Sequence, residues 1–263
     1  MNSTIPRLVG MVHLLPLPGS PRYLGSIDQV VDTAGEDART LLDAGFPALL
    51  VENFGDVPFH ADRVPPETIA AMTSAATAIA GLGAPFGVNV LRNDGLAALG
   101  IAVATGADYM RVNVLIGTML TDQGPIVGNA ADLMRARRAL AAEVEVWADV
   151  MVKHAVPPPG LDAGRAAADT VERGLADAVI FSGPGTGVEP DLLVASVIKS
   201  AVPEGTRVVV GSGATSDNLD QLLSIADTVI VGSSIEVDGR AGNRPDPLRA
   251  KSFVERAAER GLV

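Results

Sequence analysis

The chain has 263 residues, a hydrophobic content of 48% and no cysteine, so it can bury a large core but has no disulfide or thiolate metal site. Its formal net charge of −11 argues against nonspecific binding to nucleic acids and to anionic membranes, although a local pocket can still bind a small anion. No signal-like leader and no apolar run of roughly 18 residues is present, so we expect a soluble, cytoplasmic protein without an integral membrane segment.

In chain order, short apolar segments rich in β-branched residues alternate with longer segments that have helical periodicity. Gly45, Gly106 and Gly174 each follow a helical segment, as expected of glycines that end a helix in the left-handed conformation. We expect strands at 7–14, 48–53, 86–92, 109–115, 145–152, 176–183, 207–213 and 228–234, and helices that include 29–45, 129–143 and 247–261.

Strands that alternate with helices predict βαβ units and a parallel sheet. Eight such units in about 250 residues match the α/β class and the (β/α)8, or TIM, barrel. The alternative is an open doubly wound sheet, which usually has a glycine-rich turn after its first strand. Here that turn, "LLPLPGSPRY", is rich in proline and lacks G-x-G-x-x-G. No linker divides the sequence, so we predict one barrel domain over residues 1–263, with the proline-rich segment 15–23 above its C-terminal mouth.

The sixth, seventh and eighth predicted strands each end in a turn of small residues, "SGPGTG", "GSG" and "GSS". In (β/α)8 barrels, the loops after strands seven and eight commonly bind phosphate. Glycine lets backbone N–H groups approach an anion, serine adds a hydroxyl donor, and a following helix N-terminus adds partial positive charge. Barrel turns also favour glycine for conformational reasons alone, but three consecutive turns of this kind favour phosphate binding. The predicted phosphate-binding residues are Ser182, Gly183, Gly185, Thr186, Gly187, Gly211, Ser212, Gly213, Gly232, Ser233 and Ser234.

Charged and amide side chains lie near the C-terminal ends of the first five predicted strands, where barrel active sites are built. Asp149 and Lys153 share one face of the fifth strand, so both should point into the barrel. His13 ends the first strand and His154 follows Lys153, and imidazole is suited to proton transfer near neutral pH. We predict these four residues as the catalytic acid–base groups. The residues expected to position polar groups of the substrate are Glu52, Asn89, Arg111 and Asn113.

Three alternatives for these polar residues remain open. They could form a purely structural ion-pair network, because buried charges need partners. Lys153, one of three lysines in the chain, could form a Schiff base with a substrate carbonyl or simply pair with an anion. Glu52 and Asp149 could hold Mg²⁺ together with asparagine oxygens, although the H-x-H that usually begins a metallohydrolase barrel is absent. We expect no required cofactor, with Mg²⁺ as the open option.

Five segments resemble the BtpA/SgcQ family: "GMVHLLPLPGSPRY", "ADVMVKHA", "FSGPGTG", "VVVGSGATSDN" and "DGRAGNRPDPLRAKSFV". The resemblance spans nearly the whole chain and implies a barrel of the ribulose-phosphate-binding type. Cyanobacterial members are associated with photosystem I biogenesis or stability at the thylakoid membrane, which implies peripheral membrane association as an option. Other members occur among carbohydrate-utilisation genes and have been described as nucleoside triphosphatases or sugar-phosphate enzymes. The motif G-x-x-x-x-G-K-[ST] of P-loop NTPases is absent, so a P-loop mechanism is not expected.

The sequence thus predicts a protein that binds a phosphorylated sugar or related metabolite and transfers protons next to a carbonyl, as isomerases, epimerases and aldolases do. The phosphate should contact the backbone N–H groups of Gly213 and of Ser233 or Ser234. The alternative is a non-catalytic photosystem I biogenesis factor that uses the barrel as a scaffold. The expected partner is a small phosphorylated metabolite and not a nucleic acid, and a homo-oligomer is possible. The fold alone does not identify the substrate.

Overall fold

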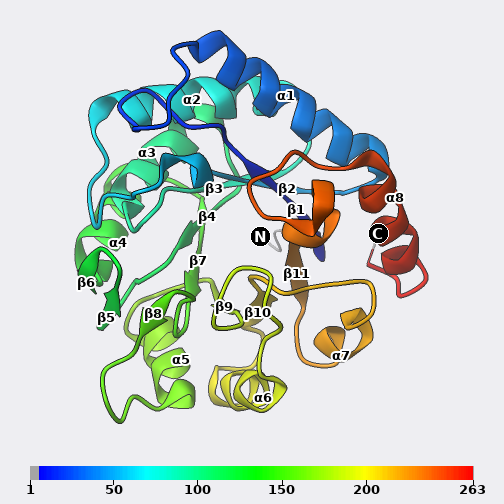
Figure 1. Cartoon of the computed structure of the whole chain (residues 1–263). Coiled ribbons are helices and arrows are strands. Elements are labelled where there is room, and N and C mark those ends of the chain that lie inside the picture. Colours follow the sequence, from blue (N-terminus) through cyan, green and yellow to red (C-terminus); the bar gives the residue numbers. More distant parts are fainter. Residues whose placement is uncertain (1–5, 263) are drawn as a thin grey trace.

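Eight parallel strands close into a barrel in the structure, a computed structural model that describes residues 6–262 (Figure 1). The ring closes where β1 pairs with β11, with Leu8 opposite Val229. The predicted (β/α)8 barrel is therefore confirmed and the open sheet is not observed. In spatial order the strands are β1 (Leu8–His13), β11 (Thr228–Val231), β10 (Arg207–Val210), β9 (Ala178–Phe181), β7 (Glu145–Asp149), β4 (Tyr109–Val112), β3 (Phe86–Asn89) and β2 (Leu49–Glu52).

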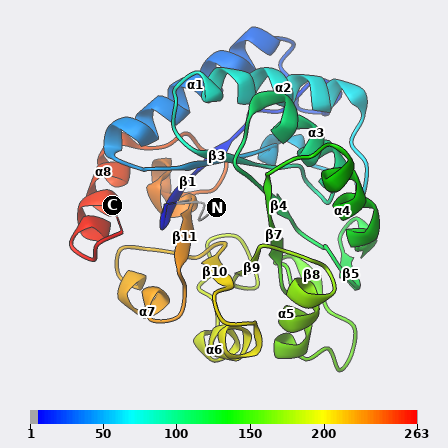
Figure 2. The same cartoon turned by 180° about the vertical axis from the view of Figure 1, so that it is seen from behind.

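The α-helices of the described chain surround the barrel (Figures 1 and 2). The helices are α1 (Ile27–Ala44), α2 (Pro66–Ala80), α3 (Gly95–Thr105), α4 (Ala130–Ala139), α5 (Ala163–Glu172), α6 (Leu192–Ala201), α7 (Leu219–Leu223) and α8 (Pro247–Ala258). Side-chain caps fix the first turns of α1, α3, α5, α6 and α8, and in α1 Ser26 Oγ accepts a hydrogen bond of 3.1 Å from the Gln29 N–H. Gly45 and Gly106 end two of these helices with φ values of 103° and 77°, as predicted.

Gly174 does not have the left-handed conformation that its position suggested. The residue with positive φ after α5 is Leu175, at 60°. A Cβ at Gly174 would lie 2.6 Å from the Thr170 carbonyl oxygen, so glycine is required there by close packing. The sequence pattern located the end of the helix but assigned the wrong physical reason to its glycine.

A three-stranded antiparallel sheet lies outside the barrel and was not predicted. It consists of β5 (Thr118–Thr121), β6 (Gly124–Val127) and β8 (Ala155–Val156), with β5 in the middle. The turn of its hairpin contains Gly124 with φ 94°. Figures 1 and 2 show these strands at the periphery of the molecule, beside α4 and α5.

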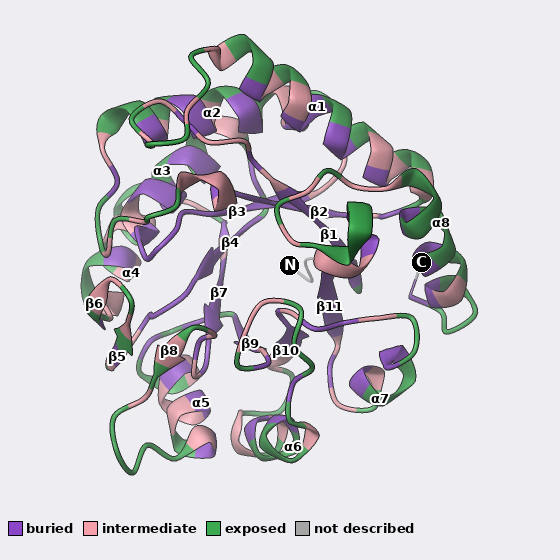
Figure 3. Cartoon of the chain, in the orientation of Figure 1, coloured by how far each residue is buried: buried purple, intermediate pink, exposed green. Residues whose placement is uncertain are grey.

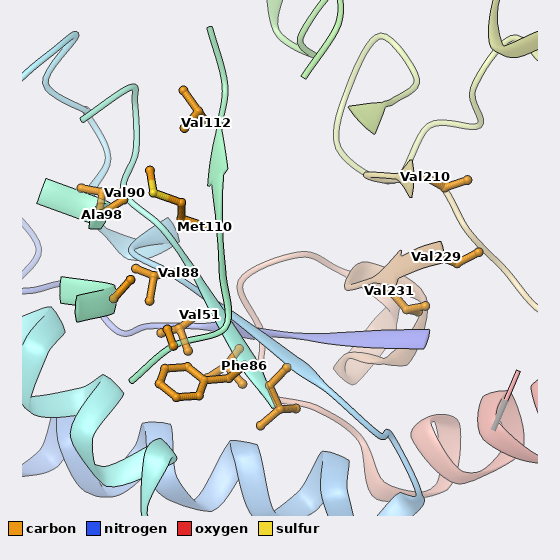
Figure 4. Close-up of a cluster of buried hydrophobic side chains, with 14 of the residues drawn as sticks. Val51, Phe86, Val88, Val90, Ala98, Met110, Val112, Val210, Val229 and Val231 are labelled. Carbon is orange, nitrogen blue, oxygen red and sulfur yellow. The ribbon is translucent and has the colours of Figure 1, made fainter. Parts of the chain in front are cut away.

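The barrel strands alternate between an outer apolar face and the barrel interior. On the outer face, residues such as Val51, Val88 and Met110 are fully buried against the helices (Figures 3 and 4). Inside, Tyr109 and Trp147 stack at 4.2 Å between ring centroids and fill the N-terminal half of the barrel. The polar residues of the same strands lie toward the C-terminal ends, which leaves this end of the barrel available for chemistry.

The proline-rich segment 15–23 lies beside the barrel mouth. The Leu17 N–H donates a 2.8 Å hydrogen bond to Asp56 Oδ1 in the loop after β2, and Gly19 packs near Glu67 of α2. No residue of the segment lines either of the two cavities described below, so it contributes nothing to their walls. Within residues 6–262 no helix is long and apolar enough to span a membrane.

Candidate functional site

A layer of polar side chains crosses the C-terminal end of the barrel interior. Side chains alternate between the two faces of a strand, so every second residue of a barrel strand points inward. Met11 and His13 point inward from β1, and Leu50 and Glu52 point inward from β2. The members of the layer are His13, Glu52, Asn89, Arg111, Asn113 and Asp149, which the structure brings together as predicted.

Arg111 and Asp149 form a buried, bidentate ion pair. Arg111 Nε donates to Asp149 Oδ2 at 2.9 Å and Arg111 Nη2 donates to Oδ1 at 2.8 Å, while Asn113 Nδ2 donates to Oδ2 at 3.0 Å. Burial alone would lower the pKa of Arg111, but the charge and hydrogen bonds of Asp149 outweigh it and raise that pKa. Because both Asp149 oxygens are occupied, the geometry favours a framework role for Asp149 over the predicted acid–base role.

Glu52 and His13 form the second part of the layer. Asn89 Nδ2 donates a 2.6 Å hydrogen bond to Glu52 Oε2, and Glu52 Oε1 lies 3.7 Å from His13 Nε2. Burial raises the pKa of Glu52, but Lys153, His13 and Arg111 outweigh burial and bring the pKa below its ordinary value. Glu52 is therefore an ionised carboxylate beside an imidazole.

Glu236 is a buried acidic residue of this site that the sequence analysis missed. It follows the 3₁₀ turn at Ser233–Ile235, is 1% exposed, and places Oε1 2.6 Å from His13 Nδ1. A carboxylate in this position accepts a hydrogen bond from Nδ1–H and leaves Nε2 facing Glu52. Its second oxygen, Oε2, is buried without a partner. The only sequence signal was an acidic residue shortly after a predicted phosphate loop.

Lys153 lies four residues beyond the end of β7, so the strand-parity argument does not extend to it. Its side chain nevertheless reaches the barrel interior and lines the same cavity as His13 and Glu52. Burial lowers the pKa of Lys153, and the charge of Glu52 only partly offsets this effect. The buried side chain of Arg92, also missed as a site residue, donates a 2.5 Å hydrogen bond to the Lys153 carbonyl oxygen and fixes the backbone here.

His154 does not join the polar layer. Its ring is largely exposed and contacts the loop between β9 and α6: Nε2 lies 2.8 Å from Thr186 Oγ1, and the Thr186 N–H donates to Nε2 at 3.2 Å. Burial, followed by the charges of Lys153 and Arg92, lowers the pKa of His154. The neutral ring contacts this loop and does not line the central cavity, although His154 was predicted as an acid–base group of the site.

A narrow cavity, here called the central cavity, lies between the polar layer and the glycine-rich loops. Its volume is about 20 Å³. A bound metabolite needs a pocket of several hundred Å³, so the loops have to open before a ligand can reach the polar layer. The lining residues are Met11, His13, Glu52, Arg111, Lys153, Thr186, Gly187, Gly211, Ser212, Gly213, Ala214, Gly232 and Ser233.

A second cavity of about 430 Å³, here called the rim cavity, opens to the side of the first. The two cavities share Thr186, Gly187, Ala214 and Ser233, so they are separated by one thin wall of loop residues. The rim cavity also contains a cation, Arg240, that the sequence analysis did not select. Its lining is completed by Phe54, Thr215, Ser234, Gly239 and Ala241.

Three serine hydroxyls in the predicted phosphate loops are buried without a hydrogen-bond partner: Ser182, Ser212 and Ser234. A buried hydroxyl without a hydrogen-bond partner destabilises the folded protein. Such hydroxyls on three consecutive loops are expected where a ligand supplies the missing partners. Ser212 lines the central cavity and Ser234 the rim cavity, whereas Ser182, Gly183 and Gly185 line neither.

The glycines of these loops are needed for close approach. A Cβ at Gly183 or at Gly213 would collide with the Val188 carbonyl, so the segment around Val188 packs directly on the loop after β10. Gly187 and Gly213 have φ values of 75° and 80°, which favour glycine. A substitution at Gly213 would distort the loop itself and cannot serve as a clean test of phosphate binding.

The polar layer is a poor match for a divalent cation. Among residues 6–262 no group of three or more histidine, aspartate or glutamate side chains is arranged to hold a metal ion. Both Asp149 oxygens face Arg111 or Asn113, and one Glu52 oxygen accepts from Asn89. Because a guanidinium already neutralises Asp149, we derive no step that uses Mg²⁺.

A larger cavity of about 860 Å³ lies on the flank of the barrel, between α4 and α5. Its lining is mostly apolar and includes Leu115, Ile116 and Met134, with Asn113 and Asp149 at its inner end. It lies away from the glycine-rich loops, whereas His13, Glu52 and Lys153 line the central cavity. We therefore assign the candidate site to the central and rim cavities.

The model of the BtpA family matches residues 4–259 of the chain. "Photosystem I biogenesis protein BtpA" of Synechocystis is 46% identical over 253 residues, which are 96% of this chain and 88% of that protein. An uncharacterized protein of Thermococcus kodakarensis is 51% identical over 96% of this chain and 95% of its own length. The "Putative sgc region protein SgcQ" of Escherichia coli is 30% identical over 95% of this chain and 93% of its own length.

Solved structures with only 15% sequence identity have the same fold. "Native KDPGal structure" aligns with a TM-score of 0.61 over 100% of this chain and 99% of that chain. The phosphoribosyl anthranilate isomerase of Thermus thermophilus aligns with a TM-score of 0.59 over 96% of this chain and 98% of that chain. The thiamine phosphate pyrophosphorylase of Pyrococcus furiosus gives a TM-score of 0.58 over 96% of each chain. These likenesses agree with the (β/α)8 barrel fold of this chain.

Proposed function

The chain belongs to the BtpA family, and from this premise we propose that it binds a small phosphorylated metabolite and transfers protons next to a carbonyl of that metabolite. The observation that carries the proposal is the set of three partnerless buried hydroxyls on consecutive loops beside a titratable polar layer. Two fold neighbours are named as a phosphoribosyl anthranilate isomerase and a thiamine phosphate pyrophosphorylase, and these names support a phosphorylated ligand.

The phosphate binds in the rim cavity in this proposal. Ser233, Ser234 and Thr215 supply hydroxyl and backbone donors there, and Arg240 supplies the positive charge. Hydroxyl and amide donors can hold an anion with little help from cations, which fits a chain of net charge −11. The reacting end of the metabolite then extends past Gly187 into the central cavity.

His13 is the proton-transfer group of the proposed reaction. Glu236 accepts a hydrogen bond from Nδ1–H, so the ring presents Nε2 to the cavity as the proton-transfer atom, and Glu52 beside it stabilises the imidazolium. Arg111 can donate to an oxygen that becomes negative during the reaction, and Asp149 holds its guanidinium in position. Isomerisation, epimerisation and aldol cleavage share a need for a base and for a group that stabilises negative charge on oxygen, and His13 and Arg111 are of these two kinds.

Isothermal titration calorimetry with D-ribose 5-phosphate and inorganic phosphate tests the proposal. The double variant Ser233→Ala/Ser234→Ala should lose at least tenfold in affinity, because each hydrogen bond to a charged group contributes about 1.5–3 kcal/mol. Ser196→Ala, on the exposed face of α6, is the matched control and should bind as the parent does. Equal affinity in the double variant and the control would contradict the phosphate site.

A second function is supported by one finding, the 46% identity to a protein named for photosystem I biogenesis. In that case the barrel acts as a non-catalytic assembly factor. The two functions differ in one measurable respect: an assembly factor should still support photosystem I accumulation in a cyanobacterial deletion strain when His13→Gln or Glu52→Gln is introduced. An enzyme whose product is needed should not.

A further inference from the structure

Lys153 holds a distinct position among the lysines of the chain. The other two lie on outer helices: Lys199 of α6 binds Asp227 at 2.7 Å, and Lys251 of α8 is exposed to solvent. Lys153 alone lines the central cavity. The chain thus contains one interior amine and two surface amines that serve as internal references.

The Nζ atom of Lys153 has no hydrogen bond or ion pair to any residue within 6–262. The hydrogen bond of this residue is made by its backbone carbonyl, which accepts from Arg92. A half-buried ammonium without a partner is costly, and desolvation lowers the pKa of Lys153 accordingly. The charged groups around it are Glu52 and Asp149, which favour the ammonium, and Arg111 and Arg92, which oppose it. A free amine at this position is a nucleophile.

We propose that Lys153 forms an imine with the aldehyde or ketone carbon of the substrate, an inference that rests on the proposed function. The Nζ lone pair attacks the carbonyl carbon, the carbonyl oxygen takes up a proton, and the nitrogen loses one, which gives a carbinolamine. Protonation of its hydroxyl then releases water and leaves the iminium. Glu52 and His13 line the same cavity and are the proton carriers for these steps.

The iminium makes the neighbouring bond easier to break. When the adjacent bond is C–H, its electron pair forms the C=C bond of an enamine, the C=N electrons move onto the nitrogen, and the released proton goes to His13 or Glu52. When the adjacent bond is C–C, the hydroxyl on its far carbon gives its proton to one of these groups, and that fragment leaves as an aldehyde while the same enamine forms. Return of a proton and addition of water then free the product and restore the amine. The substrate class is therefore a phosphorylated aldose or ketose whose carbonyl lies within reach of Lys153.

Reductive trapping tests this inference with the full-length chain. The protein is incubated with sodium cyanoborohydride and D-ribose 5-phosphate, dihydroxyacetone phosphate or pyruvate, and the adduct is mapped by peptide mass spectrometry. We expect one adduct per chain, on Lys153, with Lys199 and Lys251 labelled only at the level of background reductive amination. Glycerol 3-phosphate, which has no carbonyl, should give no adduct.

Three variants separate the nucleophile from its charge. Lys153→Met and Lys153→Arg should both lose the adduct, and Lys199→Met should keep it. Lys153→Arg should still bind the probes in calorimetry, because it retains a positive charge but has no nucleophilic amine. The inference would be overturned if Lys153→Met lost probe binding while Lys153→Arg still formed as much adduct as the parent, because the amine of Lys153 would then not be the nucleophile.

The trapping and binding results fail in different ways. A probe that binds in calorimetry but yields no adduct on Lys153, or an equal distribution of label over the three lysines, overturns the imine and leaves the proposed function standing. If none of the probes binds, the proposed function fails, and the imine proposal fails with it.

Discussion

At the scale of single residues, the Arg111–Asp149 pair is the most constrained feature of the polar layer. Both side chains are almost completely buried, and neither has water as an alternative partner. Removal of one member would leave the other charged and unpaired, which costs about 3–5 kcal/mol. Arg111→Met should therefore lower the free energy of unfolding by about this amount, as measured by urea denaturation.

A double variant separates the pair from the packing around it. Arg111→Met/Asp149→Leu removes both charges and should recover a large part of the lost stability, because apolar residues of similar volume often replace buried ion pairs without penalty. If the single and double variants are equally unstable, the loss comes from packing and the ion-pair argument is incorrect.

Arg240 provides a second residue-scale prediction. Its side chain lies on the exposed edge of the rim cavity, so Arg240→Ala should weaken binding of D-ribose 5-phosphate about tenfold while the melting temperature stays unchanged. Calorimetry and a thermal melt measure the two quantities. Arg165→Ala, an exposed arginine on α5, is the control. A lower melting temperature with unchanged affinity would show that Arg240 stabilises the fold and does not bind the phosphate.

The sequence identified most of the polar layer because strand periodicity places alternate residues inside a barrel. Glu52, Asn89 and Arg111 each occupy the inward position at a strand end, so local pattern was sufficient. Glu236 could not be found in this way, because it meets His13 across 223 residues and sits on an irregular turn. The position of His154 could not be found in this way either, because once β7 ends, local pattern no longer determines side-chain direction.

At the scale of elements, the loop between β9 and α6 contributes Thr186 and Gly187 to the wall of the central cavity. Within this loop, the backbone of Val188 packs closely against Gly183. The same backbone packs against Gly213 of the loop after β10, and Thr186 is hydrogen-bonded to His154. The unexpected hairpin β5–β6 lies elsewhere, on the flank, and its half-exposed strands gave no clear alternation in the sequence. Barrel strands and helices were predictable because each buries an apolar face. The strands β5 and β6 outside the barrel were not, because they are only partly buried.

The hydrogen bond between His154 and Thr186 makes closure of this loop depend on pH. The pKa of His154 lies below its ordinary value of 6.5, so the neutral ring accepts from the Thr186 N–H at and above that pH. As pH falls through the lowered pKa, Nε2 becomes protonated and can no longer accept, so the closed loop loses this stabilisation. Lys153 and Arg92 oppose the protonation and Asp122 favours it.

Nuclear magnetic resonance relaxation of residues 183–189 checks this dependence. Mobility should be low at neutral pH and rise below pH ~6.5, and His154→Ala should be mobile at every pH. Thr186→Val removes the hydroxyl but keeps the N–H, so it should retain most of the pH dependence. A loop in the parent that is equally rigid above and below this range would contradict the assignment.

At the scale of the whole molecule, the closed barrel requires both ends of the chain. β1 pairs with β2 on one side and with β11 on the other, and Val229 N–H donates to the Arg7 carbonyl near the point of closure. β10 pairs with β11 through Val209 opposite Thr228. Without β11, the strand edges of β1 and β10 would both be left without partners.

This closure has a consequence for synthesis on the ribosome. The N-terminal strand leaves the exit tunnel first, yet one of its edges has to wait for residues 228–231, so the nascent chain exposes a β edge for most of its translation. A chain that stops after Asp227 models the last of these states and should aggregate or bind chaperones when released from the ribosome. A full-length chain released under the same conditions should stay in solution. Recovery of the truncated chain as a folded monomer, measured by sedimentation and proteolysis, would show that seven strands suffice.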